Sequence, residues 1–474
     1  MQFASLPYLL FFVFVLTLTW TVGRNRIIRN VILLLFSYIF YAQISVQALM
    51  LLILSTAINY LLGEFIVLSK KQFRRWTLYI GLGFNLGFLG VFKYLNFFRE
   101  TAESICWFFG LEAHLPLVTM LLPIGISFYT FQALTYLIDL YRWHGVRANS
   151  LIDFALYQAF FPKILIGPIC RSVDLLPQIH ADPAKDIGNT TEAGILILSG
   201  LFKKIIIATI LYEHGVTDAF QDPEAYSFIG LWGAMIGYSI QLYCDFSGYT
   251  DLARGSALLL GFHIPDNFKS PYIASNLGEF WQRWHITFSQ WLRDYIYIPL
   301  GGSFQSTWRV SFNLFITFLF CGFWHGASWG YVLWGAWHGI GLAAHKQNRD
   351  RMRRKGLDPT KPSPIQYWVG WLYTFLFVAS SRIVFVSPDL SSSWVYYKRL
   401  FELDSTGQGA KITLVYAICL GLLINFQGRG FFFSLHQSLE ERSKLFQACF
   451  FIGIILFLNL LRPGGIPPYL YSQF

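Results

Sequence analysis

The chain has 474 residues, of which 55% are hydrophobic, 19% aromatic and only 13% charged. A soluble domain carries about 25% charged residues, so this composition is typical of a membrane protein and excludes an ordinary soluble enzyme. The net charge of +10 does not indicate a nucleic-acid partner, because the basic residues gather beside apolar runs and no basic soluble module occurs. We therefore predict an all-α polytopic membrane protein that forms one domain over residues 1–474.

The amino-terminal apolar run predicts an uncleaved first span. No charge precedes Arg24, and Arg26 and Arg29 follow it, whereas a secretory signal has its positive charge in front. The positive-inside rule then places the amino terminus on the outer side of the membrane. The apolar stretch 31–68 is long enough for a helical hairpin that returns to the same side.

Further apolar runs lie at residues 77–97, 115–138, 194–211, 226–244, 310–323, 329–344, 365–387, 411–426 and 445–461. About 20 residues cross a bilayer as a helix, so we predict about eleven crossings. The stretch "FFPKILIGPIC" (160–170) contains two prolines and a glycine and cannot form a regular spanning helix. We expect a re-entrant segment beside a cavity, with a simple extramembrane loop as the alternative.

The stretch "HKQNRDRMRRKGLDPTKP" (345–362) carries seven lysines and arginines against two aspartates. Positive charge next to spans favours the cytoplasm, so this stretch predicts a cytoplasmic basic loop. The loop either orients the chain only or also attracts a polyanionic cytosolic ligand.

Three histidines, His285, His325 and His338, each follow a tryptophan. An ionisable group at membrane depth is a functional candidate by default, and histidine exchanges protons near neutral pH. Cys321 precedes His325 by four residues, so a thiolate that carries the acyl group is a further hypothesis, although buried cysteine is usually inert. The six cysteines show neither a disulfide framework nor zinc-ligand spacing, and we predict no metal site.

Glycines recur at four-residue intervals, at Gly322, Gly326 and Gly330 and again at Gly335 and Gly339. Helices with this spacing present a bare strip that allows close approach of a neighbouring helix or of a substrate chain. The letters "GASWG" match the G-x-S-x-G nucleophile motif, but no β-strand precedes them, so the motif is rejected.

A series of six stretches carries a family resemblance: "LLPIGISFYTFQALTYLIDLYR" (121–142), "FFPKILIGPICR" (160–171), "GLFKK" (200–204), "QLYCDFSGYTDLARG" (241–255), "NFKSPYIASNLGEFWQRWHITFSQWLRDYIYIPLGG" (267–302) and "FWHGASWGYVLWGAWHG" (323–339). In order and spacing the series resembles the membrane-bound O-acyltransferase family, of the bacterial alginate O-acetyltransferase type. The resemblance covers most of the chain and is densest from 121 to 345. A series of this length is far more specific than any single motif.

The resemblance implies a fold, a donor and two site residues. The implied fold is a ring of about eleven transmembrane helices with re-entrant segments around a central tunnel. The implied donor is cytosolic acetyl-CoA, a substrate, with no permanently bound cofactor. By position in the motifs, His325 matches the catalytic histidine and His285 the second histidine, whereas His338 lies in a recurrent motif without an assigned role.

Acetyl transfer from a thioester to a hydroxyl needs a base for the hydroxyl proton and stabilisation of a developing oxyanion. We assign the base to His325, and His285 would orient the acceptor or the thioester. Asp245 and Asp251 are expected to fix the tunnel architecture with Arg254.

Charged residues also occur in the aromatic stretch 276–303, which is expected to form a partly amphipathic helix at the membrane interface. Arg283, Arg293 and Lys269 are the predicted ligands of the CoA phosphates. Ion pairs of the two arginines with Glu279 and Asp294 are the alternative.

The expected function is transfer of acetyl across the bacterial inner membrane to hydroxyls of an exopolysaccharide of the alginate or cellulose kind, either directly or through a periplasmic partner acetyltransferase. The implied partners are a periplasmic SGNH-type acetyltransferase and a polysaccharide synthesis and export complex, beside membrane lipid. Ala208, Thr209 and Ser472 depart from the family pattern, which leaves the acceptor open to peptidoglycan or, with D-alanine as the acyl group, teichoic acid. A transporter with a histidine proton relay and a scaffold without chemistry are the other classes.

Overall fold

The computed structural model describes residues 3–112, 116, 123–184, 187–359 and 361–461. Every regular element in these ranges is a helix, as predicted. Part of the predicted span 115–138 and the carboxyl-terminal residues 462–474 lie outside the described residues. Two compact units occur, unit 1 (Met1–Ile197 with Tyr249–Pro265) and unit 2 (Leu198–Gly248 with Asp266–Phe474). That the chain forms a single domain, and that its helices form a ring around a tunnel, stay predictions.

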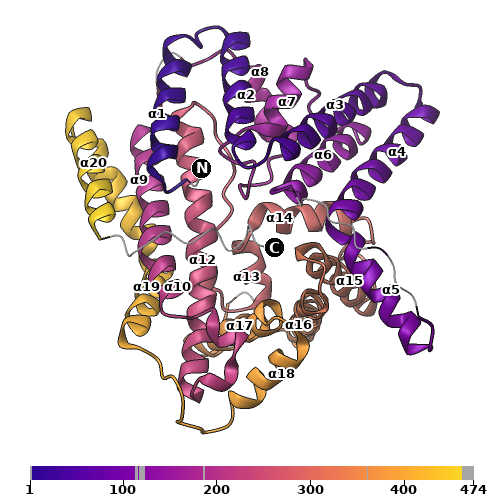
Figure 1. Cartoon of the computed structure of the whole chain (residues 1–474), viewed down its shortest axis with the longest axis vertical. Helices are drawn as coiled ribbons and strands as arrows, with labels where there is room; N and C mark the ends of the chain where they lie inside the picture. Colours follow the sequence, from indigo (N-terminus) through magenta and orange to yellow (C-terminus); the bar gives the residue numbers. More distant parts are fainter. Residues whose placement is uncertain (1–2, 113–115, 117–122, 185–186, 360, 462–474) are drawn as a thin grey trace. The chain divides into compact units, whose positions relative to one another are not determined.

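The elements of unit 1 are α1 (Leu6–Thr21), α2 (Arg26–Ala42), α3 (Val46–Leu68), α4 (Lys71–Leu89), the π-helical turn η1 (Gly90–Tyr94), α5 (Leu95–Phe108), α6 (Ile126–Tyr141), α7 (Leu151–Ala159) and α8 (Ser172–His180). Helix α9 (Thr190–Leu201) starts in unit 1, and α12 (Phe228–Leu259) ends in it. Figure 1 labels these helices in chain order.

The elements of unit 2 are η2 (Phe202–Ala208), α10 (Thr209–Glu213), α11 (Asp218–Gln221), η3 (Pro223–Ala225), η4 (Pro271–Ile273), α13 (Leu277–Arg283), α14 (Ile286–Leu292), η5 (Arg293–Tyr297), α15 (Thr307–His325), α16 (Trp329–Arg354), α17 (Pro364–Val386), α18 (Leu390–Arg399), α19 (Ile412–Glu440) and α20 (Lys444–Leu460). Turns η2 and η5 are π-helical, and η3 and η4 are 3₁₀-helical.

Four helical stretches of the described residues are long and apolar enough to cross a membrane, namely Val46–Leu68, Lys71–Phe108, Thr190–Glu213 and Pro364–Val386. A fifth is added if the bent pair Ile412–Phe426 and Gly430–Glu440 is one span. These helices make the chain a multi-pass membrane protein, while the number of about eleven crossings stays a prediction. Helices α2 and α3 are joined by three residues and pack against each other, so the predicted turn within 31–68 is present, while the return of the pair to the same side of the membrane stays a prediction.

Buried amide groups join helices within unit 1. Asn59 on α3 and Asn85 on α4 exchange two hydrogen bonds, of 3.1 Å and 2.7 Å. Inside a membrane protein such pairs hold helices together, since an unpaired amide in an apolar surrounding is unfavourable. Helices α3, α4 and α6 all pack against one another, so these three helices form one bundle within the unit.

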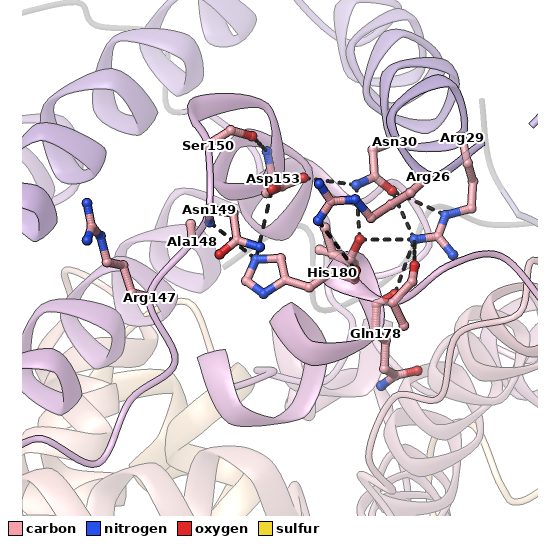
Figure 2. Close-up of polar contacts among 12 residues, drawn as sticks. Arg26, Arg29, Asn30, Arg147, Ala148, Asn149, Ser150, Asp153, Gln178 and His180 are labelled. Carbon is pink, nitrogen blue, oxygen red and sulfur yellow. Dashed lines mark hydrogen bonds and ion pairs between the residues drawn. The ribbon is translucent and has the colours of Figure 1, made fainter.

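A second polar network fastens α2 to α7 and α8 (Figure 2). Asn30 donates to the Asp153 carboxylate at 2.9 Å and accepts from the Arg29 guanidinium at 3.1 Å and 3.2 Å. The same guanidinium donates to the carbonyl groups of Gln178 and Ile179 at the end of α8. Arg29 therefore satisfies helix carbonyls that lack a partner within the helix, which stabilises the join.

The stretch 160–170 contains no helix, as its prolines predict, and most of it is buried. Lys163 in this stretch is 3% exposed and donates to the Gln132 side chain of α6 at 2.6 Å. Irregular backbone at membrane depth needs protein or water around it, and here protein from unit 1 covers it.

The predicted basic loop 345–362 is wrong in its first half, because α16 remains helical to Arg354. Lys, Arg, Gln and Met are good helix formers, and Lys346 pairs with Asp350 one turn later at 2.6 Å. This bond lowers the pKa of the Asp350 carboxyl below its ordinary value. The basic charges are thus presented on the end of a long helix.

Candidate functional site

The stretch 276–303 does not form the single interfacial helix that its sequence predicts. Helix α13 ends at Arg283 and α14 begins at Ile286, with Trp284 extended and His285 left-handed at φ 42° and ψ 56°. A left-handed conformation costs roughly 1–2 kcal/mol for a residue with a Cβ. Strain of this kind gathers at functional sites, where the surrounding structure holds it in place.

The non-helical segment 267–269 brackets the break between α13 and α14. The Ile286 N–H donates to the Asn267 carbonyl at 2.9 Å, and the Lys269 N–H donates to the Arg283 carbonyl at 2.9 Å. Backbone groups on both sides of the break are therefore satisfied from outside the two helices. This removes the main reason for the chain to continue as one helix.

The Asn267 side chain also fixes the proton of His285. Its Oδ1 accepts from the Thr287 backbone N–H at 3.3 Å and the Thr287 hydroxyl at 2.9 Å, and lies 3.1 Å from His285 Nδ1. A backbone N–H can only donate, so this atom of the amide is the oxygen, and Nδ1 must carry the hydrogen. Neutral His285 then has its lone pair on Nε2.

His325 is the last residue of α15 and is 5% exposed. Its ring contacts Trp334 and Phe385 edge to face, with centroids 4.9 Å and 5.1 Å apart, and Trp324 at 4.6 Å. Such an aromatic surrounding keeps out bulk water, which strengthens electrostatic interactions inside it.

The two predicted histidines meet at one aromatic pair. The ring centroids of Phe288 in α14 and Trp324 in α15 lie 4.0 Å apart. The His285 ring lies 5.1 Å from Phe288 and 6.3 Å from Trp324, and the His325 ring lies 6.5 Å and 4.6 Å from the same two rings. Residues 40 positions apart in the sequence are thus brought to one place.

His338 has a different environment, although it too follows a tryptophan. It is fully buried, its Nδ1 accepts from the Trp281 indole at 3.4 Å, and its Nε2 lies 3.0 Å from the Ser381 hydroxyl. Because an indole N–H only donates, Nε2 carries the hydrogen and donates to Ser381. Both ring nitrogens are occupied by α13 and α17, which indicates that His338 is structural.

The glycine strip joins α15 to α16. A methyl group built on Gly322 would lie 2.8 Å from the Gly335 Cα, and one built on Gly339 would lie 2.9 Å from the Phe315 Cα. Of the two predicted uses of the strip, the structure shows helix packing. This packing positions His325 at the turn of the hairpin.

The three predicted phosphate ligands each have a carboxylate neighbour. Arg283 pairs with Glu279 at 2.8 Å, and Arg293 with Asp294 at 2.6 Å, as in the alternative prediction. Lys269 pairs with Asp266 at 3.4 Å. Phosphate binding by these residues stays a prediction.

Asp245 and Arg254 each have an ion-pair partner that the sequence did not predict, namely buried Lys204 of the "GLFKK" stretch for Asp245, and Glu192 at 3.9 Å for Arg254. That Asp245 and Asp251 fix the architecture with Arg254 stays a prediction. Cys321 is fully buried in α15, and no hydrogen bond among the described residues joins it to His325. The thiolate hypothesis therefore has no geometric support.

A cleft of about 1000 Å³ opens in unit 2 among α13, α16 and α17. Its lining includes Gly278 and Glu279 of α13, Gly341 and Arg349 of α16, and Thr374 of α17. The cleft shares α13 with the His285 break and α16 with the glycine hairpin. It lies on the part of α16 that leads to the basic end, where an anionic ligand would be attracted.

Two buried imidazoles that meet in a multi-pass helical protein are the arrangement expected of a membrane enzyme that transfers protons on a bound substrate. The family model that describes the membrane-bound O-acyltransferases (MBOAT) matches residues 144–387. The chain belongs to this family and is an O-acyltransferase.

Several curated relatives are similar over about three quarters of their length. A probable alginate O-acetylase of Pseudomonas putida is 40% identical over 79% of this chain and 75% of that protein, and one of Pseudomonas aeruginosa is 38% identical over 85% and 76%. A peptidoglycan O-acetyltransferase of Helicobacter pylori is 34% identical over 81% of this chain and 75% of that protein.

Sequence reasoning missed Asn267 and Arg382. Asn267 is the first residue of a quoted family stretch, but nothing local in "PDNFKSP" marks it as the partner of a histidine 18 positions later. Arg382 is a charge inside the apolar run 365–387, which is a signal for function at membrane depth.

Proposed function

We propose that the chain transfers acetyl from cytosolic acetyl-CoA, across the bacterial inner membrane, to hydroxyls of an exopolysaccharide of the alginate or cellulose kind. The observation that carries the proposal is the convergence of His285 and His325 on Phe288 and Trp324. The alginate O-acetylases support acetyl as the acyl group and a glycan as the acceptor. The proposed partners are a periplasmic SGNH-type acetyltransferase and a polysaccharide synthesis and export complex.

In this proposal His325 is the general base. Its imidazole takes the proton of the attacking hydroxyl as the new C–O bond forms at the thioester carbon. The tetrahedral intermediate then re-forms its carbonyl, the C–S bond breaks, and the imidazolium returns its proton to the leaving thiolate. General base catalysis of this kind contributes about 10²- to 10⁴-fold. His285, with the tautomer set by Asn267, orients the hydroxyl through Nε2.

The cleft is the proposed entry for the donor. On α16, Gly341 of the cleft lining and Trp334 at the His325 ring are seven residues apart, which is about 10 Å along a helix. The pantetheine arm of CoA is long enough to span such a distance. Arg349, which lines the cleft, and the basic end of α16 would hold the phosphates, with Arg283 beside them.

The test uses purified protein in proteoliposomes with labelled acetyl-CoA and acceptor oligosaccharides of alginate, cellulose and peptidoglycan. We expect His325→Ala to lower transfer by at least about 10²-fold, because the base is lost. His285→Ala should lower it less. His436→Ala, which changes a histidine of α19 paired with Glu440 at 3.5 Å, is the matched control and should retain activity.

Persistent transfer by His325→Ala would contradict the mechanism. Wild-type protein that uses no thioester would contradict the function and favour a transporter or a scaffold. Preference for peptidoglycan fragments would move the acceptor toward that of the Helicobacter pylori relative.

A further inference from the structure

Arg382 is a charged residue inside an apolar helix. It lies four residues before the end of α17, a helix long and apolar enough to span the membrane, and is 2% exposed. A charge at such a position is strongly disfavoured unless it is paired or has a function.

No carboxylate among the described residues lies within ion-pair distance of Arg382. Its Nε and Nη2 donors, both buried, have no hydrogen-bond partner in the described part of the chain. Tyr272 interacts with the guanidinium through its hydroxyl, but a neutral hydroxyl does not balance a positive charge. Arg382 therefore differs from Arg29, whose donors meet helix carbonyls. Within the described residues it has unused donors and an unbalanced charge, which suits an anion that is present only during the reaction.

The guanidinium packs among aromatic rings that also surround His325, and against the tryptophan that precedes His285 in the chain. Its Cζ lies 5.1 Å from the Trp284 ring, directly before His285 in the chain. It also lies 5.9 Å from Trp334 and 5.7 Å from Phe385, the two rings that meet His325 edge to face. Three aromatic rings thus surround the cation, an arrangement that favours positive charge, and its Nε and Nη2 donors stay available to a ligand.

We propose that Arg382 is a catalytic residue that binds the oxygen of the transferred acyl group and neutralises the oxyanion of the tetrahedral intermediate. The inference rests on the proposed acyl transfer. When the hydroxyl oxygen bonds to the thioester carbon, the carbonyl π electrons move to the oxygen, and His325 takes the hydroxyl proton. The negative charge then lies against the guanidinium until the C–S bond breaks and the thiolate leaves with the proton.

A structural role predicts a different result from a catalytic one. If the guanidinium served only to pack against three rings, its removal would lower the thermal stability and leave the turnover per folded molecule unchanged. If it stabilises the oxyanion, its removal lowers kcat, because the interaction is stronger in the transition state than with bound donor. Removing an unbalanced buried charge should then leave the melting temperature unchanged or raise it.

The experiment measures kcat, KM for acetyl-CoA and melting temperature for wild type, Arg382→Met and Arg382→Lys in nanodiscs. We expect Arg382→Met to lower kcat by about 10²- to 10³-fold with KM within about threefold. Arg382→Lys should be intermediate, because it keeps the charge and loses the planar fork. A further variant, Arg382→Ala, leaves space for a small cation, so added guanidinium ion should restore part of its activity.

Arg399→Met is the matched control, since Arg399 ends α18 and pairs with Asp404 at 3.2 Å. It should lower the melting temperature with kcat unchanged. If His325→Ala is inactive, either of two results would overturn this inference and leave the proposed function standing. One is a kcat of Arg382→Met equal to that of wild type, and the other is a loss of activity in proportion to the loss of folded protein. Failure of wild type to use any acyl thioester would overturn the proposed function and this inference together.

Discussion

His285 shows how a single residue is held in a conformation that it does not prefer. Its left-handed backbone is stabilised by hydrogen bonds from residues 267–269, which lie before α13 in the chain. The same segment binds its side chain through Asn267. One short segment thus sets the backbone, the ring orientation and the tautomer of this histidine.

Asn267→Leu is predicted to lower acetyl transfer by about 10- to 100-fold, because His285 loses the acceptor that fixes its tautomer. Steady-state kinetics on reconstituted protein measure this. Asn267→Asp is the matched variant, since it keeps an oxygen at the same place and should retain more activity than Asn267→Leu. Equal losses in both variants would show that the acceptor oxygen is not what matters.

The hairpin of α15 and α16 is the element that carries His325. The hairpin is closed by glycines, because any Cβ at Gly322 or Gly335 would overlap the backbone of the facing helix. The position of the imidazole is therefore set by how closely the two helices approach.

Gly322→Ala is predicted to force the hairpin apart and to lower both melting temperature and transfer, with a destabilisation of about 1–3 kcal/mol from overpacking. Thermal unfolding in detergent and the transfer assay measure the two effects. Gly453→Ala in α20 is the control, because nothing lies within 4 Å of a Cβ there. That control should be neutral or stabilising. Identical behaviour of the two variants would contradict the close-packing account.

Helix α16 connects the histidine site at its amino-terminal end to the basic residues at its carboxyl-terminal end. It packs against α15 and α17, and its last turn exposes Arg351, Arg353 and Arg354. A helix that is apolar at one end and basic at the other is well suited to cross from membrane to cytosol.

For the whole molecule we predict that the basic end of α16 faces the cytosol. In a protein whose exposed Cys419 and Cys449 are replaced by alanine, Lys355→Cys should react with a membrane-impermeant maleimide only in inverted vesicles. Leu6→Cys, at the exposed start of α1, should react only from the outside. Labelling of Lys355→Cys in intact spheroplasts would reverse the proposed direction of acetyl transfer.

The amino-acid sequence by itself determined the class of protein and most of its helices. Apolar runs long enough for a helix, the basic residues beside them and the prolines of 160–170 are local features, and local features fix secondary structure in a membrane. The family motifs also singled out His285 and His325, which the shared tryptophan pattern alone did not separate from His338, and their catalytic roles stay a prediction.

Tertiary contacts decided the rest. The break before His285, the bond from Asn267 to its ring and the aromatic surroundings of Arg382 all join residues far apart in the chain. The occupied nitrogens of His338 likewise depend on α13 and α17. Whether the hydrogen bonds of a buried polar group are satisfied indicates whether the group is structural or free to bind a ligand. Its partners come from helices packed against it and not from its neighbours in the sequence.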